Sequence, residues 1–182
     1  MRQIRGSRVV FKITSRIIGA TALAAVVDRG ISGQTTPQML LRFRADVIEL
    51  HPRAVHILAG INDIAGNTGP TTLGNIEDNI ASMVDLARAH GIRVILGSVT
   101  PAAVIPWRTG IRPAATIHAL NAWLSAYARR RHLIYVDYYS ALTDGHGAFK
   151  AGLSSDGLHP NREGFAVMEP LTRAAMREAR EP

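Results

Sequence analysis

The sequence of 182 residues contains no cysteine, few aromatic residues and no apolar segment long enough to cross a bilayer. The absence of cysteine excludes disulfide bonds, thiolate nucleophiles and zinc ribbons. Aromatic residues make up 5% of the chain, and they do not alternate with basic residues as they do in proteins that bind single-stranded nucleic acids. We therefore expect neither a nucleic-acid partner nor a membrane span.

The positive charge of the chain comes almost entirely from arginine. The 21 basic residues are 19 arginines and 2 lysines, and the formal net charge is +7. The arginines are spread along the sequence, and the dense run 129–131 falls at an expected helix end, where cations favour the helix dipole. We interpret this charge as a solvated surface. With 47% apolar and 19% charged residues, we expect one ordinary globular domain over residues 1–182.

An apolar segment at residues 17–27 follows a basic leader and resembles the core of a signal peptide. It is too short for a membrane-spanning helix, which needs about 20 apolar residues. Cleavage after this segment would leave Asp28 as the first residue and would remove the expected first strand. We therefore expect a cytoplasmic protein, with secretion as the alternative.

Apolar segments of strand length alternate with segments of helical periodicity along the chain. Strands are expected at residues 8–13, 26–27, 54–59, 93–99 and 133–137. Helices are expected at residues 36–51, from the turn near 70 to Gly91, and at 114–131 and 161–181. This alternation predicts an α/β fold, a three-layer sandwich around a central, mostly five-stranded parallel sheet. In such sheets the ligand site lies at the carboxyl ends of the strands.

The segment Asp156-Gly157-Leu158-His159-Pro160 pairs a carboxylate with an imidazole three residues later. Asp156 can accept a hydrogen bond from one ring nitrogen of His159, and this bond fixes the tautomer and stabilises the imidazolium. The other ring nitrogen is then available as a general base. A solvated turn with an incidental histidine is the alternative, so the interpretation depends on partners elsewhere in the chain.

Two loops after predicted strands supply such partners. Residues 28–36 read Asp-Arg-Gly-Ile-Ser-Gly-Gln-Thr-Thr, and residues 60–63 read Gly-Ile-Asn-Asp. Together with Asp-Gly-Leu-His-Pro-Asn at 156–161, they resemble three of the four signature blocks of the SGNH (GDSL-type) hydrolases. The resemblance runs in the family's order over about residues 26–176. It implies a flavodoxin-like SGNH hydrolase fold and hydrolysis of carboxylic esters.

The same resemblance implies a role for each matching residue. Gly33 would offer its backbone N–H, and Asn62 its side-chain amide, to the oxyanion of a tetrahedral intermediate. His159 would be the general base and Asp156 its orienting partner. Asp63 would hold its own loop in shape. The resemblance implies no cofactor and no metal.

The first signature block of the family, Gly-Asp-Ser, does not occur in this sequence, and residues 1–25 are atypical of the family. When residues 9–11 are set against the family's first strand, Ser15 falls at the position of the nucleophile. Three interpretations of Ser15 stay open: a catalytic serine in a degenerate block, an ordinary helix-cap serine, or a chain without a nucleophile. Other serines, at 7, 32, 154 and 155, lie in less suitable positions.

We therefore predict a serine esterase with the triad Ser15, Asp156 and His159, acting on short acyl esters or acetylated sugars. The alternative is a catalytically impaired relative that binds esters or carbohydrate without turnover. Trp107, in a proline-rich loop at 101–113, is expected either to line the substrate pocket or to pack that loop. The other histidines have no metal-ligand spacing and are expected to be structural or solvated. The pattern specifies a small-molecule ester as substrate but not its identity, nor the oligomeric state.

Overall fold

The structure is a computed structural model, and it describes residues 8–11 and 25–181. Ser15 and most of the apolar segment at 17–27 lie outside the described residues. Within the described part of the chain, no helix is long and apolar enough to cross a membrane.

The five strands form one parallel sheet, as the sequence predicts. They are β1 (Arg8–Phe11), β2 (Ala25–Asp28), β3 (Ala54–Ile57), β4 (Arg93–Gly97) and β5 (Ile134–Val136). Their order across the sheet is β2-β1-β3-β4-β5. The last residue of β1, Phe11, is aligned with Asp28 on one side and His56 on the other. The chain therefore leaves β1 in the middle of the carboxyl edge, between β2 and β3.

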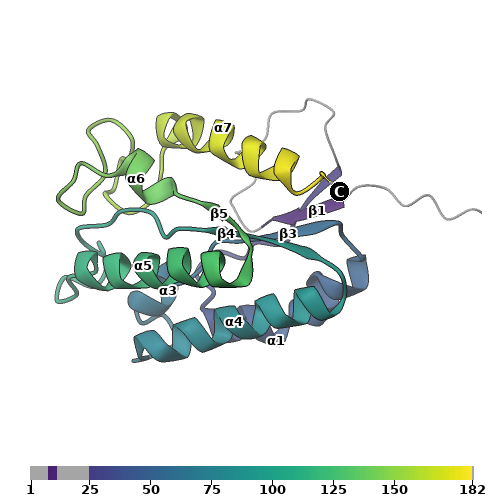
Figure 1. The fold of residues 1–182 in the computed structure, drawn as a ribbon. Coiled ribbons are helices and arrows are strands. Elements are labelled where there is room, and N and C mark those ends of the chain that lie inside the picture. The colour runs from purple at the N-terminus through teal and green to yellow at the C-terminus, as the bar shows by residue number, and fades with distance from the viewer. Residues whose placement is uncertain (1–7, 12–24, 182) are drawn as a thin grey trace, which may run out of the picture.

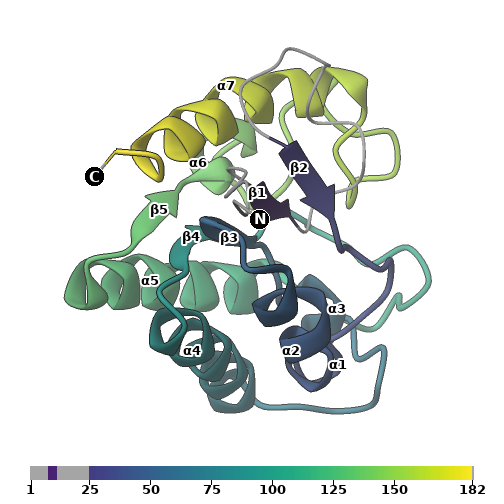
Figure 2. The same ribbon diagram turned by 90° about the vertical axis from the view of Figure 1, so that its right-hand side faces the viewer.

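Helices cover both faces of the sheet (Figures 1 and 2). They are α1 (Thr36–Leu41), α2 (Phe43–Asp46), the 3-10 helix η1 (Ile48–Leu50), α3 (Ile61–Ile64), α4 (Leu73–Ala89), α5 (Ala114–Arg131), α6 (Tyr138–Leu142) and α7 (Arg162–Glu178). Figure 1 shows α1, α4 and α5 on one face and α6 and α7 on the other. The molecule is thus the predicted three-layer sandwich.

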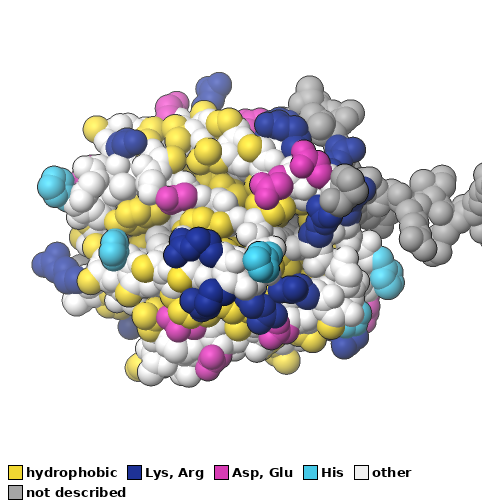
Figure 3. All heavy atoms as spheres, viewed as in Figure 1, with side chains coloured by type: hydrophobic (Ala, Val, Ile, Leu, Met, Phe, Trp, Pro, Cys, Tyr) yellow, Lys and Arg dark blue, Asp and Glu magenta, His cyan; other side chains and the backbone are white. Residues whose placement is uncertain are grey.

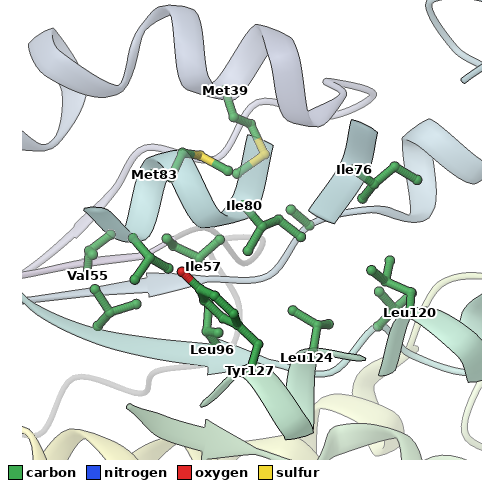
Figure 4. Packing of buried hydrophobic residues seen from close by; sticks show 14 of the residues in the cluster. Met39, Val55, Ile57, Ile76, Ile80, Met83, Leu96, Leu120, Leu124 and Tyr127 are labelled. Carbon is green, nitrogen blue, oxygen red and sulfur yellow. The ribbon is translucent and has the colours of Figure 1, made fainter. Parts of the chain in front are cut away.

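Two buried clusters hold these layers together, because alternate strand residues point to opposite faces. Val55 and Leu96 belong to the larger cluster, which includes side chains of α1, α4 and α5. Figure 4 shows α4 and α5 side chains packed against those of β3 and β4. Ala54 and Ile95 belong to the second cluster, with α6 and α7. Strands β3 and β4 are therefore buried on both faces, as expected for a parallel sheet.

The helix expected at residues 36–51 is wrong in its continuity, because the structure divides it into α1, α2 and η1. The β-branched residues Val47 and Ile48, which lower helix propensity, lie at the second break, and both are buried there. The first of these helices, α1, begins at the expected residue, Thr36, and Thr35 before it forms a capping box with Gln38. Short helices α3 and α6 were not expected, since four or five residues are too few to show a helical period.

Candidate active site

Asp156 and His159 lie in the loop that precedes α7, and they form the hydrogen bond that their spacing predicts. The Nδ1 atom of His159 is 2.7 Å from Oδ2 of Asp156. The second carboxylate oxygen, Oδ1, accepts hydrogen bonds from the backbone N–H groups of Leu158 (2.9 Å) and His159 (2.8 Å). The carboxylate is therefore held by the same turn that presents the imidazole. Since Nδ1 faces Asp156, the Nε2 edge of the ring is available for chemistry.

The charge of Asp156 is stabilised by the same contacts. Partial burial alone raises the pKa of Asp156, but the hydrogen bonds from the backbone and ring of His159 and from the backbone of Leu158 outweigh it. They hold the pKa of this carboxyl well below its ordinary value. Asp156 is therefore ionised at neutral pH, which is the state that can orient and stabilise an imidazolium.

Trp107 lies against His159, in the long loop between β4 and α5. The two ring centroids are 6.3 Å apart, and the ring planes are inclined by 22°. The indole is 53% exposed, so it does not pack the loop into the core. Of the two expected roles of Trp107, packing of the loop does not fit this exposure, and the role at a substrate pocket stays a prediction.

Gly33 lies in the loop that follows β2 and Asn62 in helix α3 after β3, and hydrogen bonds connect these two segments. The side-chain amide of Asn62 donates to the carbonyl of Gln34 (2.8 Å), which leaves its second N–H for another acceptor. The amide of Asn67 donates to the carbonyl of Gly33 (2.9 Å). Gly33 has a φ of +79°, a conformation that favours glycine. The two peptide units that follow Gly33 are therefore held by asparagine side chains.

Asp63, in α3, also connects the segments after β2 and β3, whereas it was expected to hold only its own loop. Its buried carboxylate accepts hydrogen bonds from the backbone N–H of Thr36 (3.0 Å) and from the hydroxyl of Thr36 (2.6 Å). It thus binds the first residue of α1 and not merely its own loop. Gly60 allows this loop to pass close to α5, since a Cβ atom there would lie 2.6 Å from Leu120.

The predicted site residues therefore gather at the carboxyl edge of the sheet. Gly33 lies in the loop after β2, Asn62 in the short helix α3 after β3, and Trp107 in the loop after β4. Trp107 stacks on His159, which lies in the loop before α7. Ser15 lies outside the described residues, so its position is not part of this geometry. Ser154, one of the alternative serines, uses its hydroxyl within the loop, where it accepts from the N–H of Gly157 (2.9 Å).

Two supporting residues were not found by sequence reasoning. Asn67 and Arg108 hold the site loops, Asn67 through Gly33 and Arg108 through the carbonyl of Gly66 (2.8 Å). Asn67 stood in a run of turn residues and Arg108 in a proline-rich loop, and neither pattern specifies a distant partner. The only available signal was that both residues follow strands of the predicted sheet, near the segments expected to form the oxyanion hole.

The remaining histidines show no metal site in the part of the chain that the structure describes. Among residues 8–11 and 25–181, no group of three or more His, Asp or Glu side chains is placed to hold a metal ion. His56 is buried in β3, and its Nε2 lies 3.3 Å from the hydroxyl of Tyr138. It is therefore a core residue with a hydrogen bond, as expected.

Comparisons with known proteins agree with this fold and with the sequence blocks. Residues 12–167 match the model of the GDSL-like lipase/acylhydrolase family. The chain is 42% identical to a GDSL-like lipase from Bacteroides thetaiotaomicron, with a TM-score of 0.87 over 95% of this chain and 89% of the other. It is 31% identical over 135 residues to esterase TesA of Pseudomonas aeruginosa, which covers 74% of this chain and 61% of TesA. It is also 34% identical over 79 residues to the uncharacterized lipoprotein YqeF of Bacillus subtilis. This match covers 42% of this chain and 32% of YqeF.

The chain belongs to the GDSL-like lipase/acylhydrolase family, whose members include hydrolases that act on esters. It spans about a third of the length of YqeF and about three fifths of the length of TesA.

Proposed function

We propose that the protein is a serine esterase in which His159 is the general base and Asp156 its orienting partner. The observation that carries this proposal is the pairing of Nδ1 of His159 with an ionised carboxylate at 2.7 Å. An imidazole whose Nδ1 is held in this way, and whose Nε2 faces away from Asp156, is suited to take and return a proton. Membership of a family of ester hydrolases supports the same assignment.

The reaction follows from these roles. The hydroxyl of the nucleophilic serine adds to the ester carbonyl carbon while Nε2 of His159 takes its proton. The imidazolium then gives this proton to the departing alkoxide, so that the alcohol leaves and an acyl-enzyme is formed. Water attacks the acyl group with His159 again as base, and the carboxylic acid is released with the serine restored.

The nucleophile in this proposal is Ser15. Support for it comes from topology, because β1 ends at Phe11 between β2 and β3, whose loops carry Gly33 and Asn62. A serine that follows closely after Phe11 in the sequence is the natural candidate to meet those two groups. The departure from Gly-Asp-Ser makes Ser15 the first residue to test.

The oxyanion would be stabilised by the backbone N–H of Gly33 and the second amide N–H of Asn62. The carbonyls of Gly33 and Gln34 accept hydrogen bonds from Asn67 and Asn62, and Asp63, next to Asn62 in α3, accepts a hydrogen bond from the N–H of Thr36. Donors that are fixed before the reaction need no reorganisation, and each contributes about 2.7–4 kcal/mol to transition-state stabilisation in comparable sites.

We propose short acyl chains as the acyl part of the substrate. A pocket of about 330 Å³ borders the loop that carries Asn62, and its lining includes Ile64, Leu73, Ile111 and Arg108. Apolar side chains form part of this lining, and the limited volume suits a small acyl group better than a long one. A series of aryl esters from acetate to decanoate tests this point, and we expect kcat/KM to fall as the chain lengthens.

The direct test is hydrolysis of p-nitrophenyl acetate by the parent chain and by Ser15→Ala and His159→Ala. We expect both variants to lose activity by at least about 10³-fold, because serine and histidine act as a unit. Ser82→Ala and His118→Ala, both at exposed positions of helices, are matched controls and should retain the parent rate.

Two other outcomes would change the proposal. If only His159→Ala inactivates the protein, another serine or an activated water is the nucleophile. If the folded parent hydrolyses no ester, the enzyme assignment is wrong, and the alternative of an ester- or carbohydrate-binding relative without turnover takes its place. The missing Gly-Asp-Ser block is the observation that favours this alternative.

We also propose a cytoplasmic location, with export as the alternative suggested by the basic leader and apolar segment near the N-terminus. Cell fractionation of the untagged chain, with mass determination of the mature N-terminus, distinguishes the two. Loss of residues before Asp28 would show that the segment is a signal peptide.

A further inference from the structure

An apolar surface lies beside the candidate base, on the side of the loop between β4 and α5. Trp107 is 53% exposed and Val104 43% exposed, and these two are among the four large hydrophobic side chains that the described residues leave exposed. The ring of Trp107 stacks on His159. Val104 lies close to the loop that carries His159, since its side chain is 3.9 Å from where a Cβ atom would stand on Gly157. Exposed apolar groups that gather next to a reactive side chain are typical of a ligand-binding surface.

The loop holds Trp107 in this exposed position by specific contacts. Ala102 and Ile105 are buried and anchor the loop in the core. The N–H of Arg108 donates to the carbonyl of Ile105 (2.9 Å), and the Arg108 guanidinium donates to the carbonyl of Gly66 (2.8 Å). The indole therefore projects from a braced turn and not from a loose segment. Burying an indole is favourable in itself, so an indole held half in solvent indicates a function for the exposed face.

The position of Trp107 relative to His159 decides which part of an ester it would meet. In acyl transfer the base returns its proton to the oxygen of the leaving alcohol, so this oxygen must come within about 2.6–3.2 Å of Nε2. Nδ1 is occupied by Asp156, so the alcohol has to approach the Nε2 edge of a ring that has Trp107 stacked on one face. The proposed oxyanion donors come from the loops after β2 and β3, whereas Trp107 comes from the loop after β4.

We propose that Trp107 recognises the alcohol part of the ester and selects alcohols with a flat ring over small alkyl alcohols. The ring would be an aryl group or the apolar face of a pyranose, lying against the indole while its ester oxygen reaches His159. This inference rests on the proposed function and names the leaving-group specificity of the same site.

The test compares three acetates that share one acyl group: phenyl acetate, a mono-acetylated methyl glucoside and ethyl acetate. Each variant is compared with the parent on the same substrate, so that differences in leaving-group reactivity cancel. We expect Trp107→Ala to lower kcat/KM for the phenyl and sugar acetates about three- to tenfold more than for ethyl acetate, the effect of losing one aromatic contact. Trp107→Phe keeps a ring face and should keep most of the preference. Leu41→Ala, at the other large exposed apolar side chain on α1, is the control and should alter no ratio.

The arms of this experiment also identify the alcohol. A loss confined to phenyl acetate assigns an aryl alcohol, and a loss confined to the acetylated glucoside assigns a sugar. An equal loss on all three acetates overturns the inference, because Trp107 would then act only by holding His159. No loss on any acetate overturns it as well. If the parent hydrolyses none of the three, the proposed function fails and this inference fails with it, an outcome distinct from an active parent with unchanged ratios.

Discussion

The two edges of the parallel sheet carry different kinds of side chains and perform different tasks. At the carboxyl edge, the strands lead into loops whose asparagine and aspartate side chains bind backbone groups of neighbouring loops. At the amino edge, arginine side chains donate to the last carbonyl groups of helices. Arg88 donates to the carbonyl of Arg131 (3.0 Å), and Arg93 donates to the carbonyl of Glu178 (3.3 Å).

Arginines at the amino edge account for part of the positive charge of the chain. The last four carbonyl groups of a helix have no partner within the helix, and the helix dipole places negative partial charge there. Arg53 donates to the carbonyl of Arg180, two residues beyond the end of α7. A pocket of about 440 Å³ at this edge is lined by Arg88, Arg93, Arg131 and Glu178. Figure 3 shows Lys and Arg side chains gathered over α5 and toward α4.

The comparison shows how one topology separates stability from chemistry. In a parallel sheet with crossover helices, every helix ends near the amino edge and every strand ends near the carboxyl edge. Long cations suit the first edge, because they stabilise helix ends. Short side chains that fix loop conformation suit the second, because a reactive site needs groups held in place. Arginine side chains at this edge therefore serve helix ends, as the contacts of Arg88 and Arg93 show.

The largest expected effect at the carboxyl edge comes from Asp156→Asn. The asparagine keeps an oxygen for the backbone N–H groups, but its amide would face Nδ1 of His159 and force the ring into the wrong tautomer. We expect kcat for an aryl ester to fall about 10³- to 10⁴-fold, as in other triads, while the melting temperature changes little. Asp144→Asn is the matched control, since Asp144 also accepts hydrogen bonds from the N–H groups of its own loop. Equal activity of the two variants would contradict the role of Asp156.

A smaller effect, on stability and not on one catalytic step, is expected for Asp63→Ala. The substitution leaves the N–H and hydroxyl of Thr36 without their buried acceptor. We expect the free energy of unfolding in urea to fall by about 2–4 kcal/mol, since each unsatisfied buried group costs about 1–3 kcal/mol. Asp78→Ala, at an exposed position of α4, should change it by less than about 0.5 kcal/mol. If the two variants were equally stable, the hydrogen bonds between Asp63 and Thr36 would contribute nothing to the free energy of unfolding.

His56, in the core between the two edges, should make the free energy of unfolding depend on pH. Complete burial lowers the pKa of His56 from 6.5 to about 3. Between these values the unfolded chain binds a proton that the folded protein does not, so the free energy of unfolding falls as the pH falls, by at most about 1.4 kcal/mol per pH unit. His56→Gln should make the decline between pH 6 and 4 shallower in urea titrations, whereas His118→Gln should not. A decline of the same slope in His56→Gln would exclude His56 as its source.

The smallest expected effect lies at the amino edge. Arg93→Met removes one hydrogen bond and one favourable charge at the end of α7. We expect a loss of about 0.3–1 kcal/mol in the free energy of unfolding at low salt, less at high salt, and no change in kcat/KM. Arg44→Met, an exposed arginine on α2, serves as control. A loss of activity in Arg93→Met would break the separation between the two edges.

The strands and long helices could be predicted because their signals are local. The apolar segments of β3 and β4 and the periodic residues of α5 specify their own structure, and α5 occupies the expected residues Ala114–Arg131. The expected helix at 36–51 failed because its breaks depend on how Val47 and Ile48 meet the core. Helices α3 and α6 were missed because each is shorter than two helical turns.

The candidate site divides in the same way. Sequence alone determined the pairing of Asp156 with His159, since residues three apart in a tight turn meet through local geometry. Only the tertiary structure decided that Asn67 holds Gly33, that Asp63 holds Thr36 and that Trp107 stacks on His159. These partners are tens of residues apart in the chain. They meet because parallel strands bring successive loops to one edge, and no local pattern records which of those loops will touch.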